Sequence, residues 1–233
     1  MTKNSPLVSF IISVYNDEHR ITKALESVVT QSYKNIEIRI MDDASTDNTL
    51  KKIQHFASEN KNVFIYKNKR NIGLTKSLNI LLAESEGDYI ARQDSDDLSH
   101  YNRIKKQIDA FNKYNLDFCS TRALVKDSKK TIPGISFYIP KKLLIKYKNP
   151  FVHGTLLIKK NVIKEVGFYN ENYYFSQDYK LMIDLVKSGY KFKTLNEKLY
   201  TLNLSNNISE NFSNEQKYYA KCAQKGITPN SII

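Results

Sequence analysis

The stretch "DYIARQDSDDLSHYNRI" (88–104) runs from an apolar segment into a cluster of acids and then into a helix-like pattern. The apolar segment ends at Ile90 and Ala91, and three carboxylates follow within four positions, at Asp94, Asp96 and Asp97. Carboxylates this close raise one another's pKa unless a cation neutralises them. In an open α/β sheet, ligands bind outside the carboxyl ends of the strands. The stretch therefore predicts a strand-to-helix loop that holds a cation.

Strand-like and helix-like segments alternate on both sides of this stretch. Runs rich in β-branched and aromatic residues predict strands at 7–14, 36–41, 63–66, 88–93 and 116–121. Apolar residues at helical spacing predict helices at 19–31, 46–57, 74–84 and 102–114. Ser45, Thr46 or Asp47 is expected to cap the second of these helices. Repeated strand–helix units predict an α/β fold with a mostly parallel central sheet flanked by helices.

The second half of the chain has a different pattern. From 122 to about 150 it is basic and interrupted by Pro and Gly, after which a strand is predicted at 154–159. A helix is predicted at 177–189, with Gly189 as its stop. We divide the chain into one half at 1–121, a second half of the same domain at 122–204, and a polar tail with a short helix at 205–233.

The charge is unevenly spread along the chain. There are 36 Lys and Arg against 24 Asp and Glu, a formal net charge of +12, and residues 122–165 alone hold 11 basic and 2 acidic residues. Such a patch could face nucleic acid, an anionic membrane surface or a phosphorylated substrate, or it could be a solvated lysine-rich face. The segment "PKKLLIKYK" (140–148) supports a membrane contact only weakly, because it is short and its apolar arc is imperfect.

Cysteine use and hydropathy indicate a compartment. Cys119 and Cys222 make no disulfide framework, and no Cys or His spacing suggests zinc. There is no apolar run of about 18 residues that would span a membrane. The first residues, "MTKNSPLVSF" (1–10), lack the apolar region of a signal peptide. We therefore expect a cytoplasmic protein.

Three strand ends carry polar residues, "SVYND" (13–17), "MDDASTD" (41–47) and "QDSDD" (93–97), and a parallel sheet brings them to one edge. A divalent Mg²⁺ or Mn²⁺ ion suits carboxylate ligands and is commonly completed by substrate phosphates. Ordinary capping loops are the alternative. The chain has neither a Gly-x-Gly-x-x-Gly nor a P-loop motif, so side chains and a metal would have to hold a nucleotide. This pattern points to a nucleoside diphosphate.

With these motifs in order, the sequence resembles the inverting family 2 glycosyltransferases of GT-A fold, which in bacteria assemble polysaccharides and other glycans. The resemblance runs from about Pro6 to Leu204. It rests on the order and spacing of "VSFIISVYND", "ALESVVTQSYKNIEIRIMDDASTD", "NIGLTKSLN", "GDYIARQDSDD", "NRIKKQ", "FVHGTLLIKK", "VGFYNE" and "SQDYKLMIDLVKSGY". It implies a Rossmann-like central sheet, a nucleotide-sugar donor-binding half at 1–121 and a smaller acceptor-side half at 122–204.

The resemblance implies roles for residues at the first two strand ends. Ser13, Tyr15 and Asn16 would lie beside the nucleotide base and ribose. Asp43 would accept a hydrogen bond from the base, and Asp42 would support the turn. These residues would therefore form the nucleoside part of the donor site.

The third strand end would hold the metal and the diphosphate. "DSD" (94–96) resembles the family's Asp-x-Asp motif, with Asp96 as the principal ligand of Mn²⁺ or Mg²⁺ and Asp94 as a second. Asp94 and Ser95 would also lie near the ribose and diphosphate. Lys76, in "GLTKSLN", falls where the family often keeps a basic residue for the donor.

The acceptor side carries the residue that resembles the family's catalytic base, Asp178. The family usually shows Glu-Asp there, whereas this chain has Gln177 before Asp178, a departure that bears on acceptor handling. His153, in "FVHG", is expected either to touch the metal, the diphosphate or the acceptor, or to be a buried structural histidine.

The function implied is that of an inverting hexosyltransferase. It would move a sugar from a nucleoside diphosphate donor, a UDP-sugar, to a hydroxyl of a glycan or lipid-linked acceptor, without nucleic acid as a partner. The basic stretch at 122–165 would allow peripheral contact with an anionic membrane surface at the inner face of the membrane. The sugar, the acceptor, the linkage and the oligomeric state are left open by the sequence.

Three other classes of protein were weighed. A nucleic-acid-binding module would suit the pI of about 9.4, but no helix-turn-helix, zinc or RNA-binding signature is present. A non-catalytic, transferase-like scaffold is favoured only by Gln177. A sugar-phosphate nucleotidyltransferase would carry a glycine-rich basic loop after the first strand, which "SVYNDEHR" (13–20) does not resemble.

Overall fold

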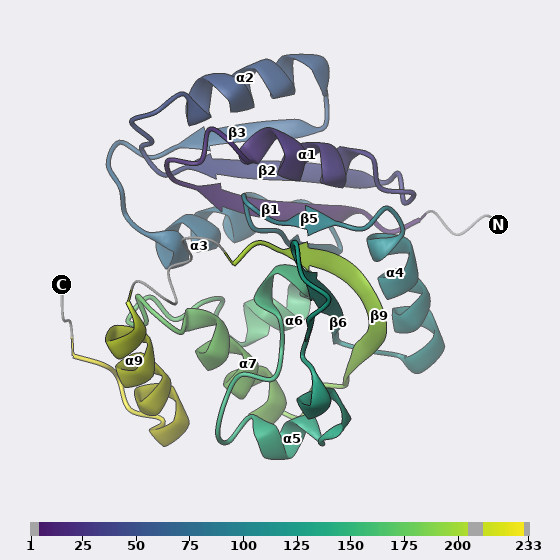
Figure 1. The fold of residues 1–233 in the computed structure, drawn as a ribbon, viewed down its shortest axis with the longest axis vertical. Coiled ribbons are helices and arrows are strands. Elements are labelled where there is room, and N and C mark those ends of the chain that lie inside the picture. The colour runs from purple at the N-terminus through teal and green to yellow at the C-terminus, as the bar shows by residue number, and fades with distance from the viewer. Residues whose placement is uncertain (1–4, 205–211, 231–233) are drawn as a thin grey trace.

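The computed structural model describes residues 5–204 and 212–230 (Figure 1). The first half alternates strands and helices as predicted, except for the short β5, which was not predicted: β1 (Val8–Val14), α1 (Ile21–Val29), β2 (Ile36–Asp42), α2 (Thr49–Glu59), β3 (Val63–Lys67), α3 (Leu74–Glu84), β4 (Tyr89–Arg92), β5 (Leu98–Ser99), α4 (Arg103–Tyr114) and β6 (Phe118–Val125). The second half contains β7 (Thr131–Ile132), η1 (Ile135–Tyr138), α5 (Lys141–Leu144), η2 (His153–Thr155), β8 (Leu157–Lys159), α6 (Lys160–Glu165), α7 (Gln177–Lys187), β9 (Phe192–Leu202) and α9 (Ser213–Lys225).

The described strands form one sheet in the order β3-β2-β1-β4-β8-β6-β9-β5, with β7 paired to β6. Pairing is parallel from β3 to β4 and between β6 and β9, whereas β8 runs antiparallel to both of its neighbours. The sheet curls, and β9 sweeps through the middle of the molecule as a bent ribbon (Figure 1). The prediction of an α/β fold with a mostly parallel central sheet flanked by helices is confirmed.

Each face of the sheet has its own apolar core. One core joins the sheet to α1, α2 and α4, and the other joins it to α3, α6, α7 and α9. Helix α1 shows how the sequence dictates this, because Ile21, Ala24, Leu25 and Val28 recur at helical spacing and all have exposed fractions of 0%. Burying an aliphatic side chain of this size contributes about 1.5–3 kcal/mol before entropic costs.

Helix α2 begins later than the sequence predicts. The expected caps at Ser45, Thr46 or Asp47 are wrong, because the helix starts at Thr49 after Asn48. Residues 45–48 bond mainly to the loop after β1: the backbone N–H of Thr46 donates to Asn16 Oδ1 at 2.8 Å, while Asp47 Oδ1 also accepts from the Thr49 N–H at 2.9 Å. This segment therefore belongs to the loops at the sheet edge.

Strand β9 has no counterpart in the sequence prediction. Its exposed and buried positions do not alternate with a period of two, because its register with β6 shifts on both sides of Arg122. The strand predicted at 154–159 is also shorter, since a 3₁₀ turn occupies His153–Thr155 before β8 begins. The helix predicted at 177–189 is α7, and Gly189, at φ +81°, follows its end as expected.

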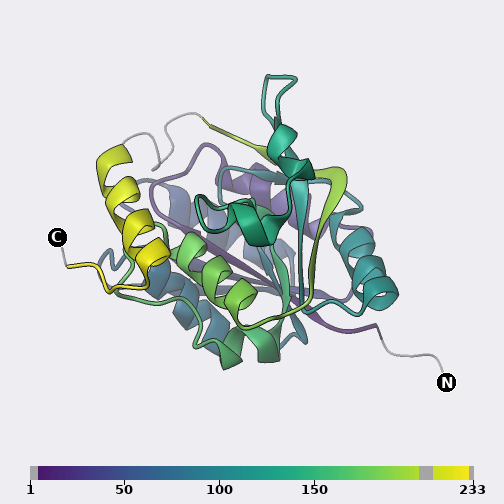
Figure 2. The ribbon, with the colours of Figure 1, turned by 90° about the horizontal axis from the view of Figure 1, so that it is seen from below.

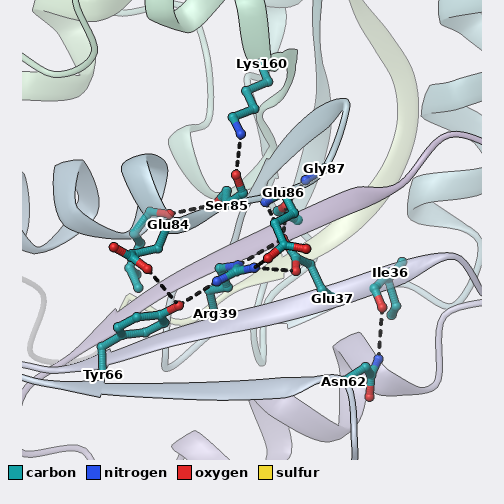
Figure 3. A network of polar contacts seen from close by, with 12 residues as sticks. Ile36, Glu37, Arg39, Asn62, Tyr66, Glu84, Ser85, Glu86, Gly87 and Lys160 are labelled. Carbon is teal, nitrogen blue, oxygen red and sulfur yellow. Dashed lines mark hydrogen bonds and ion pairs between the residues drawn. The ribbon is translucent and has the colours of Figure 1, made fainter.

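A buried polar network holds the turn that leads into β4 (Figure 3). Arg39 donates to Glu37 at 2.9 and 2.8 Å, donates to the Tyr66 hydroxyl at 2.5 Å, and forms an ion pair with Glu86 at 3.2 Å. The Glu86 backbone N–H donates to Glu37 at 2.8 Å. Burial would raise the pKa of Glu37, but hydrogen bonds from Arg39, Ser9 and this N–H lower it below its ordinary value. The network fixes β4, and with β4 the acidic loop that follows it.

The C-terminal helix packs against the body of the domain. Tyr219, Cys222 and Ala223 of α9 are buried in the same core as α7, and both cysteines are free. Part of the polar tail predicted before this helix, residues 205–211, lies outside the described residues. Within the described ranges, we find no helix with the length and hydropathy to cross a bilayer.

Candidate functional site

The ends of β1, β2 and β4 meet at one edge of the sheet. Val14 pairs with Asp42 at the end of both strands, and the Asp43 N–H donates to the Val14 carbonyl at 2.8 Å. On the other side of β1, Ile11 pairs with Arg92, the last residue of β4. The three polar stretches that the sequence places after these strands are therefore neighbours in space.

The loop after β1 is fastened to the loop after β2. The Asn16 N–H donates to Ser45 Oγ at 3.0 Å, and the Asp17 N–H donates to Thr49 Oγ1 at 2.8 Å. Asn16 has a left-handed φ of +50°, a conformation that Asn tolerates better than most residues. Ser13 is half-buried, whereas Tyr15 is exposed at this edge.

Asp42 and Asp43 are both buried, but their contacts differ. Asp43 accepts from Asn68 Nδ2 at 2.7 Å and from the N–H groups of Ile72 and Gly73 at 2.9 and 2.8 Å. It thereby holds the loop that precedes α3. Asp42 Oδ2 accepts from the Ser45 N–H at 3.2 Å, and Asp42 Oδ1 has no hydrogen-bond partner among the described residues. The sequence predicts that Asp42 supports the turn after β2. Asp43 also has a structural role, because it holds the loop before α3.

The acidic loop after β4, residues 93–97, packs against the loop after β1. Ser95 Oγ donates to Asp17 Oδ2 at 2.7 Å, and Arg20 contacts Asp17 at 2.5 Å and Asp96 at 3.4 Å. Burial, followed by repulsion from Asp94, raises the pKa of Asp96 to about 6, although Arg20 opposes this. Sequence reasoning did not assign roles to Asp17 or Arg20, even though Asp17 ends the quoted stretch "SVYND".

Asp94 and Asp97 are held by residues from distant parts of the chain. The buried Arg92 forms an ion pair with Asp94 at 2.5 Å, and the Asp94 N–H donates to the Tyr200 hydroxyl at 3.1 Å. Asp97 accepts from the Asn203 N–H at 2.6 Å. Burial and then the charge of Asp94 raise the pKa of Asp97 to about 8.

A glycine lets η2 approach the acidic loop. A Cβ on Gly154 would lie 2.8 Å from Asp94 Oδ2 and closer still to the Tyr200 hydroxyl, so only glycine fits between them. The next residue towards the N-terminus is His153, which this close approach brings beside the acidic loop. The "FVHG" motif therefore serves the site partly through its glycine, a role that the sequence did not indicate.

The carboxylates of the acidic loop suit a divalent cation whose coordination is completed by a bound ligand. No three His, Cys, Asp or Glu side chains in residues 5–204 and 212–230 are arranged to hold a metal ion by themselves. Asp94 and Asp96 nevertheless offer carboxylate oxygens, and Mg²⁺ commonly takes one or two of these together with substrate phosphates. Burial and then the charge of Asp94 raise the pKa values of Asp96 and Asp97, and a bound cation would oppose both effects.

His153 pairs with a buried tyrosine. Its Nε2 lies 2.7 Å from the hydroxyl of Tyr169. Loss of solvent, followed by the charge of Arg92, lowers the pKa of His153 to about 4, while Asp178 and Asp94 act in the opposite direction. The imidazole is therefore neutral at pH 7. Of the two roles that the sequence allowed for His153, this fits the buried structural histidine.

Asp178 lies in the first turn of α7, where the helix dipole favours a negative charge. Asn149 Nδ2 donates to Asp178 Oδ2 at 2.7 Å. Gln177 is buried. Asn149 lies in the segment that leads into η2, whose Gly154 packs against Asp94, so this segment connects Asp178 to the acidic loop. Asn149 was missed by sequence reasoning, because a lone Asn in a loop carries no pattern.

Lys76 lies on the first turn of α3, the helix that begins after the loop held by Asp43. Its side chain is exposed. The structure thus brings the predicted residues of the three strand ends together, and Lys76 follows on the adjoining helix.

The chain is similar in sequence to a known family of proteins. The family model described as "Glycosyl transferase family 2" matches residues 9–167. EpsE of Bacillus subtilis is 32% identical over 206 residues, which are 84% of this chain and 73% of EpsE. WfaP of Escherichia coli, named as a UDP-Glc:alpha-D-GlcNAc-diphosphoundecaprenol beta-1,3-glucosyltransferase, is 30% identical over 194 residues, 82% of this chain and 74% of WfaP.

Solved structures share the fold. TarS 1–349 of S. aureus in complex with UDP superposes with a TM-score of 0.76 at 20% identity, covering 93% of this chain and 65% of that one. The mannosyltransferase PcManGT of Pyrobaculum calidifontis, in complex with GDP-Man and Mn²⁺, superposes with a TM-score of 0.78 at 17% identity, covering 96% and 66%. The chain thus spans about two thirds of the length of these structures.

Proposed function

The chain belongs to glycosyl transferase family 2 and has the GT-A fold, and from this premise we propose that it transfers a hexose from a UDP-sugar to an acceptor hydroxyl with inversion. One observation carries the proposal: the acidic loop after β4 packs against η2 at Gly154, and Asp178 of α7 is bonded to Asn149, five residues before that glycine. A donor diphosphate and a base on the other side of the sugar require such an arrangement. TarS with UDP and PcManGT with GDP-Man support a nucleotide-sugar donor.

The donor would lie along the ends of β1, β2 and β4. Ser13, Tyr15 and Asn16 would contact the base and ribose, together with Asp42 and Asp43. Asp94 and Ser95 would lie near the ribose and diphosphate, with Lys76 offering a positive charge from α3. We favour UDP as the nucleotide because WfaP is named for UDP-Glc and TarS was solved with UDP.

Asp96 and Asp94 would hold the divalent ion, Mn²⁺ or Mg²⁺. When bound, this ion supplies stabilisation of the negative charge that develops on the leaving nucleoside diphosphate. The presence of Mn²⁺ in the complex of PcManGT supports such an ion. Arg92 and Arg20 keep Asp94 and Asp96 in place through their ion pairs.

Asp178 would act as the catalytic base. Its carboxylate takes the proton of the acceptor hydroxyl, the acceptor oxygen forms the new bond to the anomeric carbon, and the bond from that carbon to the diphosphate oxygen breaks. The bonding electrons leave with the diphosphate, and in-line attack inverts the anomeric configuration. Asn149 orients the carboxylate by its hydrogen bond to Oδ2, and no described residue donates to Oδ1.

The acceptor would be a glycan or a lipid-linked saccharide in surface glycan assembly. The lipid-linked acceptor in the name of WfaP supports this choice. We place the protein in the cytoplasm, in peripheral contact with an anionic membrane surface, since its two cysteines are free and buried and its basic residues concentrate at 122–165.

A panel of nucleotide sugars with Mn²⁺ or Mg²⁺ tests the proposal, with thermal stabilisation and released nucleoside diphosphate as the readouts. We expect a UDP-sugar to bind only with metal present and to be hydrolysed slowly. A protein that binds a UDP-sugar with metal but neither hydrolyses nor transfers it would favour the non-catalytic scaffold. No binding of any UDP, GDP or dTDP donor would overturn the proposed donor site.

A further inference from the structure

Exposed apolar side chains concentrate in one short segment, residues 132–148, which we call the basic lip. Ile135, Tyr147 and Tyr138 have exposed fractions of 87%, 77% and 73%, the three highest among the large hydrophobic residues that the structure describes. Leu143 adds a fourth at 56%. Single exposed hydrophobic residues need no explanation, but a contiguous group of them marks an interaction site.

These side chains project from two helical turns. Ile135 and Tyr138 are three residues apart in η1, where positions i and i+3 of a 3₁₀ helix eclipse. Leu143 and Tyr147 are four residues apart, and the helical bonds of α5 continue to Lys148 through its N–H to the Leu144 carbonyl at 3.0 Å. Each turn therefore presents its own apolar pair.

Lys141 joins the two turns into one surface. Its Nζ donates to the carbonyl oxygens of Ser136 at 3.2 Å, Phe137 at 2.6 Å and Ile139 at 3.3 Å, and lies 5.0 Å from the centre of the Phe137 ring. The Arg122 guanidinium lies 5.1 Å from the centre of the same ring, and Arg122 donates to the Pro133 carbonyl at 3.1 Å. The lip thus has a defined shape. It lies at the lower end of the molecule in Figure 1 and faces the viewer in Figure 2.

The charge of the lip is all of one sign. Residues 132–148 contain four lysines and neither Asp nor Glu. Lys142, Lys146 and Lys148 are exposed, and none of the three forms an ion pair with any described residue. Lysine stems can lie along an apolar layer while their charges stay at an anionic surface. Tyrosine side chains are likewise suited to the boundary between lipid and water.

We infer that the basic lip docks on an anionic lipid surface, with its apolar side chains inserted among the acyl chains and its lysines among the headgroups. Exposed Ile and Leu beside unpaired lysines match this partner, because apolar insertion and electrostatic attraction add in membrane-surface binding. A nucleic acid would use the lysines but leave Ile135 and Leu143 without a role. An acidic protein is the remaining alternative partner, and absence of binding to lipid vesicles would favour it.

The lip is continuous with the acceptor side of the site. Asn149 follows Lys148 directly and donates to Asp178, and the Tyr179 hydroxyl donates to the Ile145 carbonyl at 2.7 Å. Docking would therefore hold Asp178 near the lipid surface, where a lipid-linked acceptor presents its hydroxyl. Docking deepens the membrane contact named under the proposed function, and only this last step rests on the proposed sugar transfer.

Sedimentation with lipid vesicles tests the inference. We expect binding to phosphatidylcholine vesicles that contain about one third phosphatidylglycerol, little binding to phosphatidylcholine alone, and weakening by salt. Reversing three charges, by Lys142→Glu, Lys146→Glu and Lys148→Glu, is expected to weaken binding on the order of a hundredfold. Tyr138→Ser with Tyr147→Ser should weaken it while leaving the charge unchanged. The matched control reverses Lys51, Lys61 and Lys105, which are exposed elsewhere.

Equal loss in the control and lip variants would overturn the inference, as would absence of vesicle binding by the unchanged protein. Vesicle binding that Tyr138→Ser with Tyr147→Ser leaves intact would also overturn it, because adhesion would then need only charge and no apolar insertion. Metal-dependent UDP-sugar hydrolysis is measured on the same proteins without vesicles. Hydrolysis without docking defeats this inference and the proposed membrane contact but leaves the proposed sugar transfer intact, and docking without donor binding or hydrolysis defeats only the proposed sugar transfer.

Discussion

Asn149 holds the carboxylate of Asp178 through a hydrogen bond of 2.7 Å that joins the end of the basic lip to the first turn of α7. The two residues are 29 positions apart, and the bond restricts the rotation of the carboxylate at the acceptor side. A base whose proton-accepting oxygen is misplaced loses rate without losing affinity for the donor.

Asn149→Ala should therefore slow transfer, or donor hydrolysis, by roughly 10- to 100-fold, the range expected for a hydrogen bond to a charged group. The affinity for UDP should stay the same, because Asn149 makes no contact with the predicted donor residues. Asn196→Ala is the matched control, since Asn196 accepts a comparable 2.8 Å bond from Arg122 away from Asp178. An equal effect of both substitutions would remove the positioning role of Asn149.

Asp178→Asn should abolish transfer while keeping the fold and donor binding. The amide preserves size but cannot accept the acceptor proton, and general base catalysis contributes typically 10²- to 10⁴-fold. UDP binding by thermal shift and transfer on the same preparation measure the two properties separately. Transfer at the unchanged rate would exclude Asp178 as the base.

Asp96→Ala should weaken the binding of UDP that depends on Mn²⁺, because it removes a carboxylate from the predicted metal site. Titration of UDP with and without Mn²⁺ measures the effect, and the metal-dependent part of the affinity should fall at least roughly tenfold. Asp109→Ala is the control, since Asp109 is exposed on α4. Identical titrations for Asp96→Ala and Asp109→Ala would count against the assignment of the metal ligand.

His153 should make the protein less stable in acid. Its folded-state pKa of about 4 lies below the ordinary value of 6.5, so the unfolded chain binds more protons between these values. The free energy of unfolding should therefore fall as the pH drops from 6.5 to 4, by up to about 3 kcal/mol from this group. Urea unfolding across this window measures it. His153→Gln should flatten the curve, and the exposed His55→Gln should not; equal curves for His153→Gln and the unchanged protein would refute the effect.

Much of the first half could be predicted from the sequence because the signal there is local. Ile21, Leu25 and Val28 indicate a helix by spacing alone, and the strands from β1 to β4 are short apolar runs. The acidic loop was visible for the same reason, since its three carboxylates fall within four positions.

The contacts that complete the site could not be predicted, because they join residues far apart in the chain. Asp94 and Tyr200 are 106 positions apart, as are Asp97 and Asn203. Strand β9 carries Tyr200 and leads into Asn203. Its exposed and buried positions do not alternate, because its register with β6 shifts. Arg92 reads as part of a strand in the sequence, and only the fold shows that its buried guanidinium faces Asp94.

The position of β9 also bears on the synthesis of the protein. A ribosome completes the acidic loop about a hundred residues before it adds Tyr200 and Asn203. During this time the loop lacks the hydrogen bonds that these two residues form with Asp94 and Asp97. Closing a contact over such a length of chain is among the later events of folding. Under the proposed function, donor binding would therefore have to await the synthesis of β9, and a chain that lacks β9 would not sequester nucleotide sugars.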